Sequence, residues 1–260
     1  MELVEPQVSV IARTYADDDA IADYLHAIGA HEYATKHKFE SAEDLIEFAG
    51  RICYKSFQPG LNPNVTKVRD NQGAYIRNLL SKFHGSVTEH VTWTFLFENV
   101  SRIVTHELAR HRVGTATSQE SLRYVAFDGH FPVWLPDWAR DDPYFMEHAV
   151  TLVEQMEQFQ DMMAEHFDLH RPGQTFDYKK KITGFLRRFA PAGQATSLVW
   201  TANPRTLRHV IEARTSTGAE EEIRTVFSKV AVIMQSESPI LFSDFRRNDD
   251  GSWTPEWSKV

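Results

Sequence analysis

The segment Arg110–Val125, RHRVGTATSQESLRYV, gathers positive charge around a run of small and polar residues. Arg110 and Arg112 flank His111, and Arg123 follows beyond the run. Guanidinium groups present rigid forks of hydrogen-bond donors, and a loop rich in glycine and hydroxyl side chains brings further donors close to an anion. The segment therefore predicts binding of a phosphate-bearing ligand. The alternative is a basic surface that balances some of the 36 acidic residues.

A further cation, Arg214, continues the apolar stripe of a predicted helix. Leu207, Val210 and Ile211 form this stripe, and Arg214 follows the last two at spacings of four and three residues. Because a guanidinium keeps its charge, an inward-pointing Arg214 needs an acidic or electron-rich partner. A ligand oxygen and a structural ion pair both satisfy this need. Arg187 and Arg188, just before Ala190 and Pro191, raise the same question with less force, and an exposed helix end is the alternative.

Two histidine-containing segments invite a metal or ligand interpretation. HELARH, at 106–111, resembles the zinc-protease helix signature, but its histidines are five residues apart instead of four. On a helix they would lie about 140° apart, so one ion could not take both, and we expect no metal site. HGSVTEH, at 84–90, is either a polar turn before a strand or the edge of a ligand pocket.

Some of these candidate site residues must be positioned by β-strands. Alternation predicts one strand in QVSVIAR, at 7–13, and a second over 91–97. HFPVWLP, at 130–136, is a candidate third strand, which Pro132 would keep at a sheet edge.

Long helices are the other predicted elements. Apolar residues at helical spacing predict a helix from Phe145 to Phe167, ended by the RPG at 171–173, whose Met-rich stripe is core or subunit interface. Asn203 can cap a helix that has Pro204 in its first position. Apolar residues at helical spacing over 223–234 predict another helix. No repeat or linker divides the chain. We expect a single α+β domain over 1–260, with a mixed or antiparallel sheet packed with long helices.

The composition bounds the class of protein. The net charge of −8 over 260 residues argues against broad nucleic-acid binding. No window approaches the roughly 20 apolar residues of a membrane span. The single cysteine, Cys53, favours a reducing compartment, so a cytoplasmic location is expected. Cys53 lies in FAGRICYKSF, which is typical of an apolar helix, and we expect it to be a buried core residue.

RHR, a short spacer and QESLRY together resemble the signature of the flavin-dependent thymidylate synthases. The family pattern is Arg-His-Arg, seven residues and Ser, usually with Arg-Tyr just beyond. THEL at 105–108, HxSxxEH at 84–90 and NPRTLRHVIEAR at 203–214 follow the family's order and spacing. The resemblance runs from about Ala49 to about Phe245.

The resemblance implies reductive methylation at C5 of a uridine monophosphate. Methylenetetrahydrofolate would be the carbon donor, FAD the carrier and NADPH the reductant. It also implies a homotetramer with active sites shared between subunits.

The resemblance further implies two sets of site residues. The residues implied to contact FAD are Ser86, Glu89, Arg110, His111, Arg112, Asn203, Arg205 and His209. Those implied to hold the nucleotide are Glu107, Arg110, Gln119, Ser121, Arg123, Arg187 and Arg214. Arg214 would lie against the uracil as the catalytic residue. With no cysteine nucleophile evident, a permanent cation at N3 and O2 is a plausible way to polarise the ring. Ser121 has no obvious base, so we interpret it as a binding hydroxyl.

Two departures from the family pattern bear on the substrate. Eight residues, Val113–Glu120, separate Arg112 from Ser121, one more than usual, and Gly218 stands where many members have a histidine. An enlarged loop and a missing imidazole would leave room for a ribose 2'-hydroxyl, as in the methylase of polyoxin biosynthesis that accepts UMP as well as dUMP. Neutral drift of a loop is the alternative. A flavin-dependent hydroxymethylase and a binding protein without catalysis also stay open.

Overall fold

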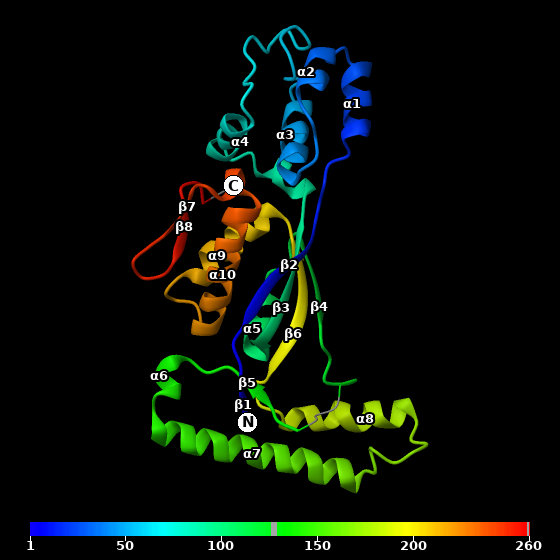
Figure 1. Cartoon of the computed structure of the whole chain (residues 1–260), viewed down its shortest axis with the longest axis vertical. Coiled ribbons are helices and arrows are strands. Elements are labelled where there is room, and N and C mark those ends of the chain that lie inside the picture. Colours follow the sequence, from blue (N-terminus) through cyan, green and yellow to red (C-terminus); the bar gives the residue numbers. More distant parts are fainter. Residues whose placement is uncertain (126–128, 259) are drawn as a thin grey trace. The chain divides into compact units, whose positions relative to one another are not determined.

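The computed structural model describes residues 1–125, 129–258 and 260. Its main sheet is antiparallel with the strand order β2-β3-β6-β4 (Figure 1). The four strands are β2 (Gln7–Arg13), β3 (Trp93–Ser101), β6 (Ala195–Ala202) and β4 (Thr115–Gln119). Short pairs form between β1 (Glu2–Leu3) and β5 (Pro132–Val133), which are parallel, and between β7 (Phe245–Arg247) and β8 (Trp253–Pro255), which are antiparallel. The expected α+β class is confirmed.

The chain forms two compact units that are interleaved along the sequence. Unit 1 comprises 1–9, 96–110 and 117–200, and unit 2 comprises 10–95, 111–116 and 201–260. The boundary passes through every strand of the main sheet. The single domain expected over 1–260 stays a prediction.

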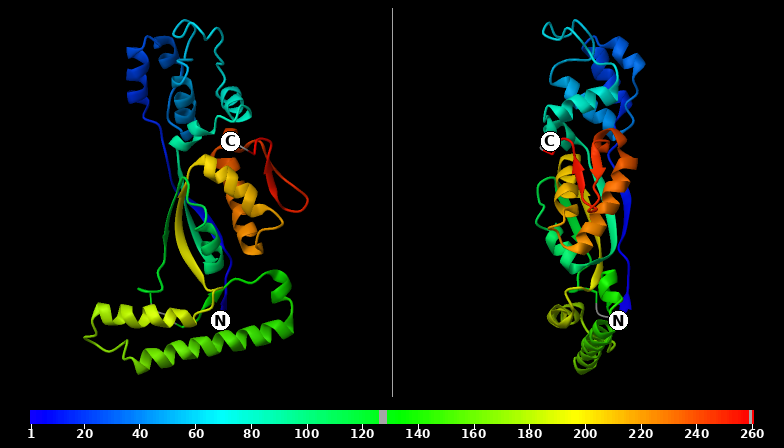
Figure 2. Two further views of the ribbon diagram at one scale, coloured as in Figure 1. Left: turned by 180° about the vertical axis from the view of Figure 1, so that it is seen from behind. Right: turned by 90° about the vertical axis from the view of Figure 1, so that its left-hand side faces the viewer.

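Unit 1 contains the longest helix of the described chain. Its helices are α5 (Arg102–Leu108), α6 (Asp137–Arg140), α7 (Pro143–His166), α8 (Phe176–Leu186) and the 3-10 turn η2 (Arg187–Phe189). Asp142 caps α7 by accepting from two backbone N–H groups, and Pro143 takes the first helical position. Helices α7 and α8 lie side by side (Figure 2), and Phe159 and Met163 of α7 pack against a buried cluster formed by Leu169, Ile182 and Leu186.

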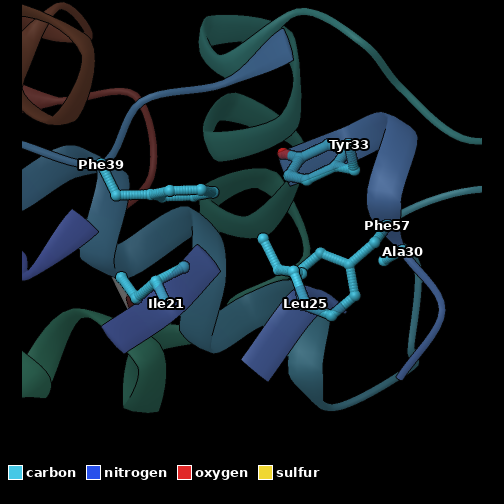
Figure 3. Close-up of a cluster of buried hydrophobic side chains, with 6 residues drawn as sticks. All are labelled: Ile21, Leu25, Ala30, Tyr33, Phe39 and Phe57. Carbon is cyan, nitrogen blue, oxygen red and sulfur yellow. The ribbon is translucent and has the colours of Figure 1, made fainter. Parts of the chain in front are cut away.

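Unit 2 is mainly helical. Its elements are α1 (Asp18–Ala27), α2 (His31–Lys36), α3 (Ala42–Ile52), α4 (Gln72–Ser81), the 3-10 helix η1 (Gly85–His90), α9 (Pro204–Thr215), α10 (Glu221–Glu237) and α11 (Pro239–Phe242). Its N-terminal part packs around a buried hydrophobic cluster (Figure 3). The cluster consists of Ile21, Leu25, Ala30, Tyr33, Phe39 and Phe57.

Most elements follow the predicted periodicities. Strand β2 covers 7–13 as expected, and the strand expected over 91–97 forms as β3, beginning at Trp93. The side chain of Asn203 accepts from the N–H of Thr206 at 2.9 Å and so caps α9. The predicted third strand is reduced to the two residues of β5, and α7 ends at His166, before the RPG. No helix in the described ranges is long and apolar enough to cross a membrane.

Two local expectations are wrong. Cys53 is exposed, because α3 ends at Ile52 and the cysteine follows its last turn. The spacer Val113–Glu120 is largely a strand, since Thr115–Gln119 forms β4 beside β6. Because β4 pairs with β6 at the edge of the sheet, this segment is a strand and not the expected loop.

Candidate functional site

Arg214 and His111 make the central contact of the site in unit 2. Arg214 Nε donates to His111 Nε2 at 2.9 Å, in a partly buried position. A histidine that accepts at Nε2 is neutral and carries its proton on Nδ1. The His111 ring also meets the ring of His209 edge to face, with centroids 5.8 Å apart. The inward-pointing arginine predicted on α9 therefore meets the histidine of the RHR segment, which is 103 residues away in sequence.

The backbone after RHR is fastened to the start of α9. Gly114 O accepts from the N–H of Asn203 at 3.2 Å, and Val113 O accepts from the hydroxyl of Thr206 at 2.7 Å. Gly114 has a φ of +68°, and a Cβ there would lie 2.3 Å from Asn203 Nδ2. A glycine is required for this approach, so residues of RHR and NPRTLRHVIEAR lie side by side.

Two of the residues implied to bind FAD line a cleft of about 340 Å³ in unit 2. Ser86 and Arg205 line it, together with the aromatic side chains of Tyr54 and Phe83. Arg205 also forms an ion pair with Glu89, which lies on the same 3-10 helix as Ser86. A guanidinium, a hydroxyl and aromatic rings in one cleft suit a ligand that has phosphate oxygens and planar rings. The donor chemistry of these residues fits part of a flavin dinucleotide.

A second cavity lies in unit 1, beside residues implied to hold the nucleotide. Leu122, between Ser121 and Arg123, lines it together with Arg187. The hydroxyl of Thr183 on α8 donates to Arg123 O at 2.8 Å, which fastens this segment to the helix that precedes Arg187. The hydroxyl of Ser121 accepts from the N–H of Arg123 at 3.3 Å.

The remaining predicted residues occupy less defined positions. Glu107 lies on α5, and its carbonyl accepts from the N–H of Arg110 at 3.3 Å. Arg110 and Gln119 are exposed in unit 1, and Arg112 is exposed in unit 2.

The two implied sets of residues fall largely into different units. Every residue implied to contact FAD lies in unit 2 except Arg110, and every residue implied to hold the nucleotide lies in unit 1 except Arg214. Within unit 2 the ion pair of Glu89 and Arg205 brings together two residues implied to contact FAD, and within unit 1 a backbone hydrogen bond joins Glu107 and Arg110 of the nucleotide set.

Sequence reasoning did not single out Arg102, which is partly buried in unit 1. Burial lowers the pKa of Arg102; the acidic side chain of Glu120 opposes this shift and the charge of Arg187 adds to it. The only available signal was an arginine directly after the N-cap Ser101, and that signal is weak. The described residues contain no group of three or more His, Cys, Asp or Glu that could hold a metal ion.

Comparison with known proteins identifies the family. Residues 36–240 match the model of the family described as "Thymidylate synthase complementing protein", or Thy1. The flavin-dependent thymidylate synthase of Corynebacterium diphtheriae is 32% identical over 215 residues, which cover 81% of this chain and 82% of that protein. The enzyme of the same description from Nitratidesulfovibrio vulgaris is 33% identical over 208 residues, covering 76% of this chain and 80% of that protein.

Solved structures share the fold at lower identity. ThyX from Helicobacter pylori, crystallised with FAD and dUMP, is 19% identical with a TM-score of 0.59, covering 92% of this chain and 98% of that chain. The UMP/dUMP methylase PolB from Streptomyces cacaoi, bound with 5-Br UMP, is 17% identical with a TM-score of 0.58, covering 94% of this chain and 95% of that chain. With the matched sequence model and the 32% identical relative, the RHR, HxSxxEH and α9 motifs place this chain among the enzymes of the flavin-dependent thymidylate synthase family.

Proposed function

We propose that this protein methylates C5 of a uridine monophosphate, with dUMP as substrate and UMP as a second candidate. The contact between Arg214 and His111 carries the proposal, because it joins the two motifs implied to hold the uracil and the flavin. FAD, methylenetetrahydrofolate and NADPH are the proposed cofactors, and when bound they supply the carbon and the hydride.

The residues of the chain position the reactants and set the electrostatic field. Uracil C5 is a weak nucleophile that a cysteine thiolate can activate by addition at C6, and the single cysteine of this sequence, Cys53, follows α3 and lines the cleft beside η1. A guanidinium against N3 and O2 stabilises negative charge that develops on the ring. The hydrogen bond to His111 fixes the direction of the Arg214 side chain. Arg214 is therefore the proposed catalytic residue, and Ser121 and Arg123 are proposed to bind the nucleotide.

Ser86, Glu89 and Arg205 are proposed to bind FAD in unit 2. The cleft beside η1 supports this assignment through the donors on its wall. His111, Arg112, Asn203 and His209 complete the proposed set, with Arg110 from unit 1.

Absorbance and tritium release test this function. The purified protein should be yellow and release FAD on denaturation, and it should release tritium from 5-tritiated dUMP only when methylenetetrahydrofolate is present. Colourless protein that does not take up FAD would contradict the proposal. Binding of dUMP without tritium release would instead indicate a binding protein, and a 5-hydroxymethyl product in mass spectrometry would indicate a hydroxymethylase.

The choice between dUMP and UMP depends on the region of Gly218. A Cβ placed on Gly218 meets no atom within 4 Å, so a side chain there has room in unit 2. If the missing imidazole admits the 2'-hydroxyl, Gly218→His should lower turnover of UMP relative to dUMP. An unchanged ratio would favour neutral drift, and turnover of dUMP alone by the unmodified protein would exclude the ribonucleotide.

A homotetramer with shared active sites is the proposed assembly. Exposed apolar side chains on α7 and α8 support it, among them Leu152, Met162 and Phe185. The cytoplasmic location stays a prediction.

A further inference from the structure

The C-terminal end of α3 forms one wall of the cleft in unit 2. Gly50, Cys53 and Tyr54 line the cleft at this end of the helix. Helix α3 ends at Ile52, so Cys53 and Tyr54 belong to the turn that follows it. The side chain of Tyr54 is 51% exposed, which leaves its ring available to a ligand. The conformation of the turn, residues 52–56, therefore sets the position of this wall.

The turn contains a residue in an unfavourable backbone conformation. Lys55 has a φ of +47°, in the left-handed region that favours glycine. Two backbone hydrogen bonds hold the turn, because Arg51 O accepts from the N–H of Tyr54 at 3.2 Å and from the N–H of Ser56 at 3.1 Å. A conformation of this kind persists only where the surrounding structure enforces it.

The side chain of Arg51 closes the same turn a second time. Its Nη1 donates to Ser56 O at 2.7 Å, and its Nη2 donates to Arg69 O at 2.5 Å. Both backbone groups of Ser56 are thus bonded to Arg51, one to its carbonyl and the other to its guanidinium. The Arg51 side chain is fully buried, so these hydrogen bonds form where water does not compete for them.

The guanidinium group of Arg51 is itself held in one orientation. Its Nε donates to Glu47 Oε1 at 2.8 Å, and the hydroxyl of Tyr33 donates to the same oxygen at 2.8 Å. Its Cζ lies 5.0 Å from the ring centroid of Tyr33 and 4.3 Å from that of Tyr75. Planar stacking and a fork of fixed donors are properties of arginine that lysine does not share. The network therefore fixes the direction of the donors that reach the turn.

We infer that Arg51 is a positioning residue for flavin binding. It closes the turn after α3 and so holds Tyr54 at the wall of the cleft in the conformation that takes FAD. The inference rests on the proposed function, because it names a residue that the proposed FAD site requires. Among the described residues, those that line the cleft do not include Arg51, so it acts through the turn and not by contact with the ligand.

The FAD affinity of an Arg51→Lys variant tests the inference. Lysine keeps the charge beside Glu47 but lacks the fork that reaches Ser56 and Arg69. FAD should therefore bind at least about 10-fold more weakly in fluorescence titrations well below the unfolding midpoint. Tritium release from dUMP at saturating FAD should match that of the unmodified protein, since the reacting groups are unchanged.

Arg224→Lys is the matched control for this substitution. Arg224 lies on α10 in unit 2, is partly buried and donates from Nη2 to Asp250 O at 2.9 Å. Its replacement also removes a fork that binds a backbone carbonyl, but away from the turn after α3. FAD affinity of Arg224→Lys should equal that of the unmodified protein.

Substitutions of Lys55 separate positioning from stability. Lys55→Gly removes the steric cost of the left-handed conformation, so the double variant with Arg51→Lys should regain most of the FAD affinity. Lys55→Val leaves the buried network intact but places a β-branched side chain at the same φ. It should weaken FAD binding, and it decides the question if Arg51→Lys does not fold.

Unchanged FAD affinity in Arg51→Lys, or in Lys55→Val, would overturn the inference. So would a weakened affinity in Arg51→Lys that Lys55→Gly does not restore, because Arg51 would then support the fold without acting through the turn. Failure of the unmodified protein to bind FAD is a different outcome, which would overturn the proposed function and this inference with it.

Discussion

At the scale of residues, the contact between Arg214 and His111 explains how a permanent cation is kept in a partly buried place. The acceptor is a neutral imidazole, which leaves the charge of the guanidinium uncompensated by that partner. A carboxylate in the same position would neutralise the field that the proposed chemistry needs. The contact between Arg214 and His111 is therefore a hydrogen bond to a neutral ring and not an ion pair.

Replacing Arg214 tests this role. Arg214→Ala should lower tritium release from dUMP by at least about 100-fold, because it removes the group that stabilises charge on the ring. FAD absorbance of the purified variant should stay at the level of the unmodified protein. Arg246→Ala, which removes an exposed arginine of unit 2, is the control and should be fully active. An active Arg214→Ala enzyme would refute the catalytic assignment.

Gly114 offers a second test at this scale. Gly114→Ala should destabilise unit 2 by more than the 1–2 kcal/mol or so that a left-handed backbone costs an alanine, because its Cβ also collides with Asn203. Loss of FAD should accompany this destabilisation. Gly29→Ala is the matched control, since Gly29 has a φ of +82° but open space around its Cβ. Equal unfolding midpoints in urea for the two variants would contradict the predicted collision.

At the scale of elements, a buried ion pair between Arg208 and Asp244 holds α9 against the C-terminal part of the chain. Arg208 donates to both carboxylate oxygens of Asp244 at 2.7 Å, and to the carbonyls of Leu241 and Trp257. The side chains of the pair are 3% and 2% exposed. This pair fastens the segment 241–257 to the helix that carries Arg205, His209 and Arg214.

Asp244→Asn should therefore lower the free energy of unfolding by about 3–5 kcal/mol, because it leaves the Arg208 charge buried without compensation. Urea denaturation followed by circular dichroism measures the effect. Glu32→Gln breaks the exposed pair of Glu32 and Lys36 and should leave the unfolding midpoint almost unchanged, because solvent screens that pair. A similar small effect for both variants would mean that the buried pair is not needed to hold the segment.

At the scale of the whole molecule, the exposed apolar residues of unit 1 require an explanation. Leu152 and Met162 of α7 are 54% and 55% exposed, and Phe185 of α8 is 48% exposed. Large apolar side chains that gather on neighbouring helices are typical of an interface between subunits. The methionines of the predicted stripe, Met156 and Met163, are partly buried and pack against buried clusters of unit 1, so they support the core interpretation, whereas exposed Leu152 and Met162 support an interface.

Leu152→Glu should reduce the mass of the assembly in sedimentation velocity at a fixed protein concentration, because it would place a charge in an apolar interface. Gln158→Glu, at an exposed position about 240° further around α7, is the control and should leave the mass unchanged. An unchanged tetramer in both variants would exclude this face of α7 from the interface, and a monomeric unmodified protein would contradict the proposed assembly.

Elements that depend on near neighbours could be predicted from the sequence. The cap of α9 by Asn203 is a contact within one turn, and the apolar spacing of α10 repeats every three or four residues, so both patterns can be recognised in the sequence. The order and spacing of the motifs also sufficed to indicate the family, which the comparisons confirmed.

Tertiary structure alone decided what depends on distant partners. The spacer before Ser121 becomes a strand because β6 pairs with it, and Cys53 is exposed because α3 ends just before it. His111 meets Arg214 across a gap of 103 residues in the sequence, which no local periodicity encodes. Local hydrogen bonds and side-chain periodicity act over a few residues, whereas the partner of a buried charge is chosen by packing of the whole chain.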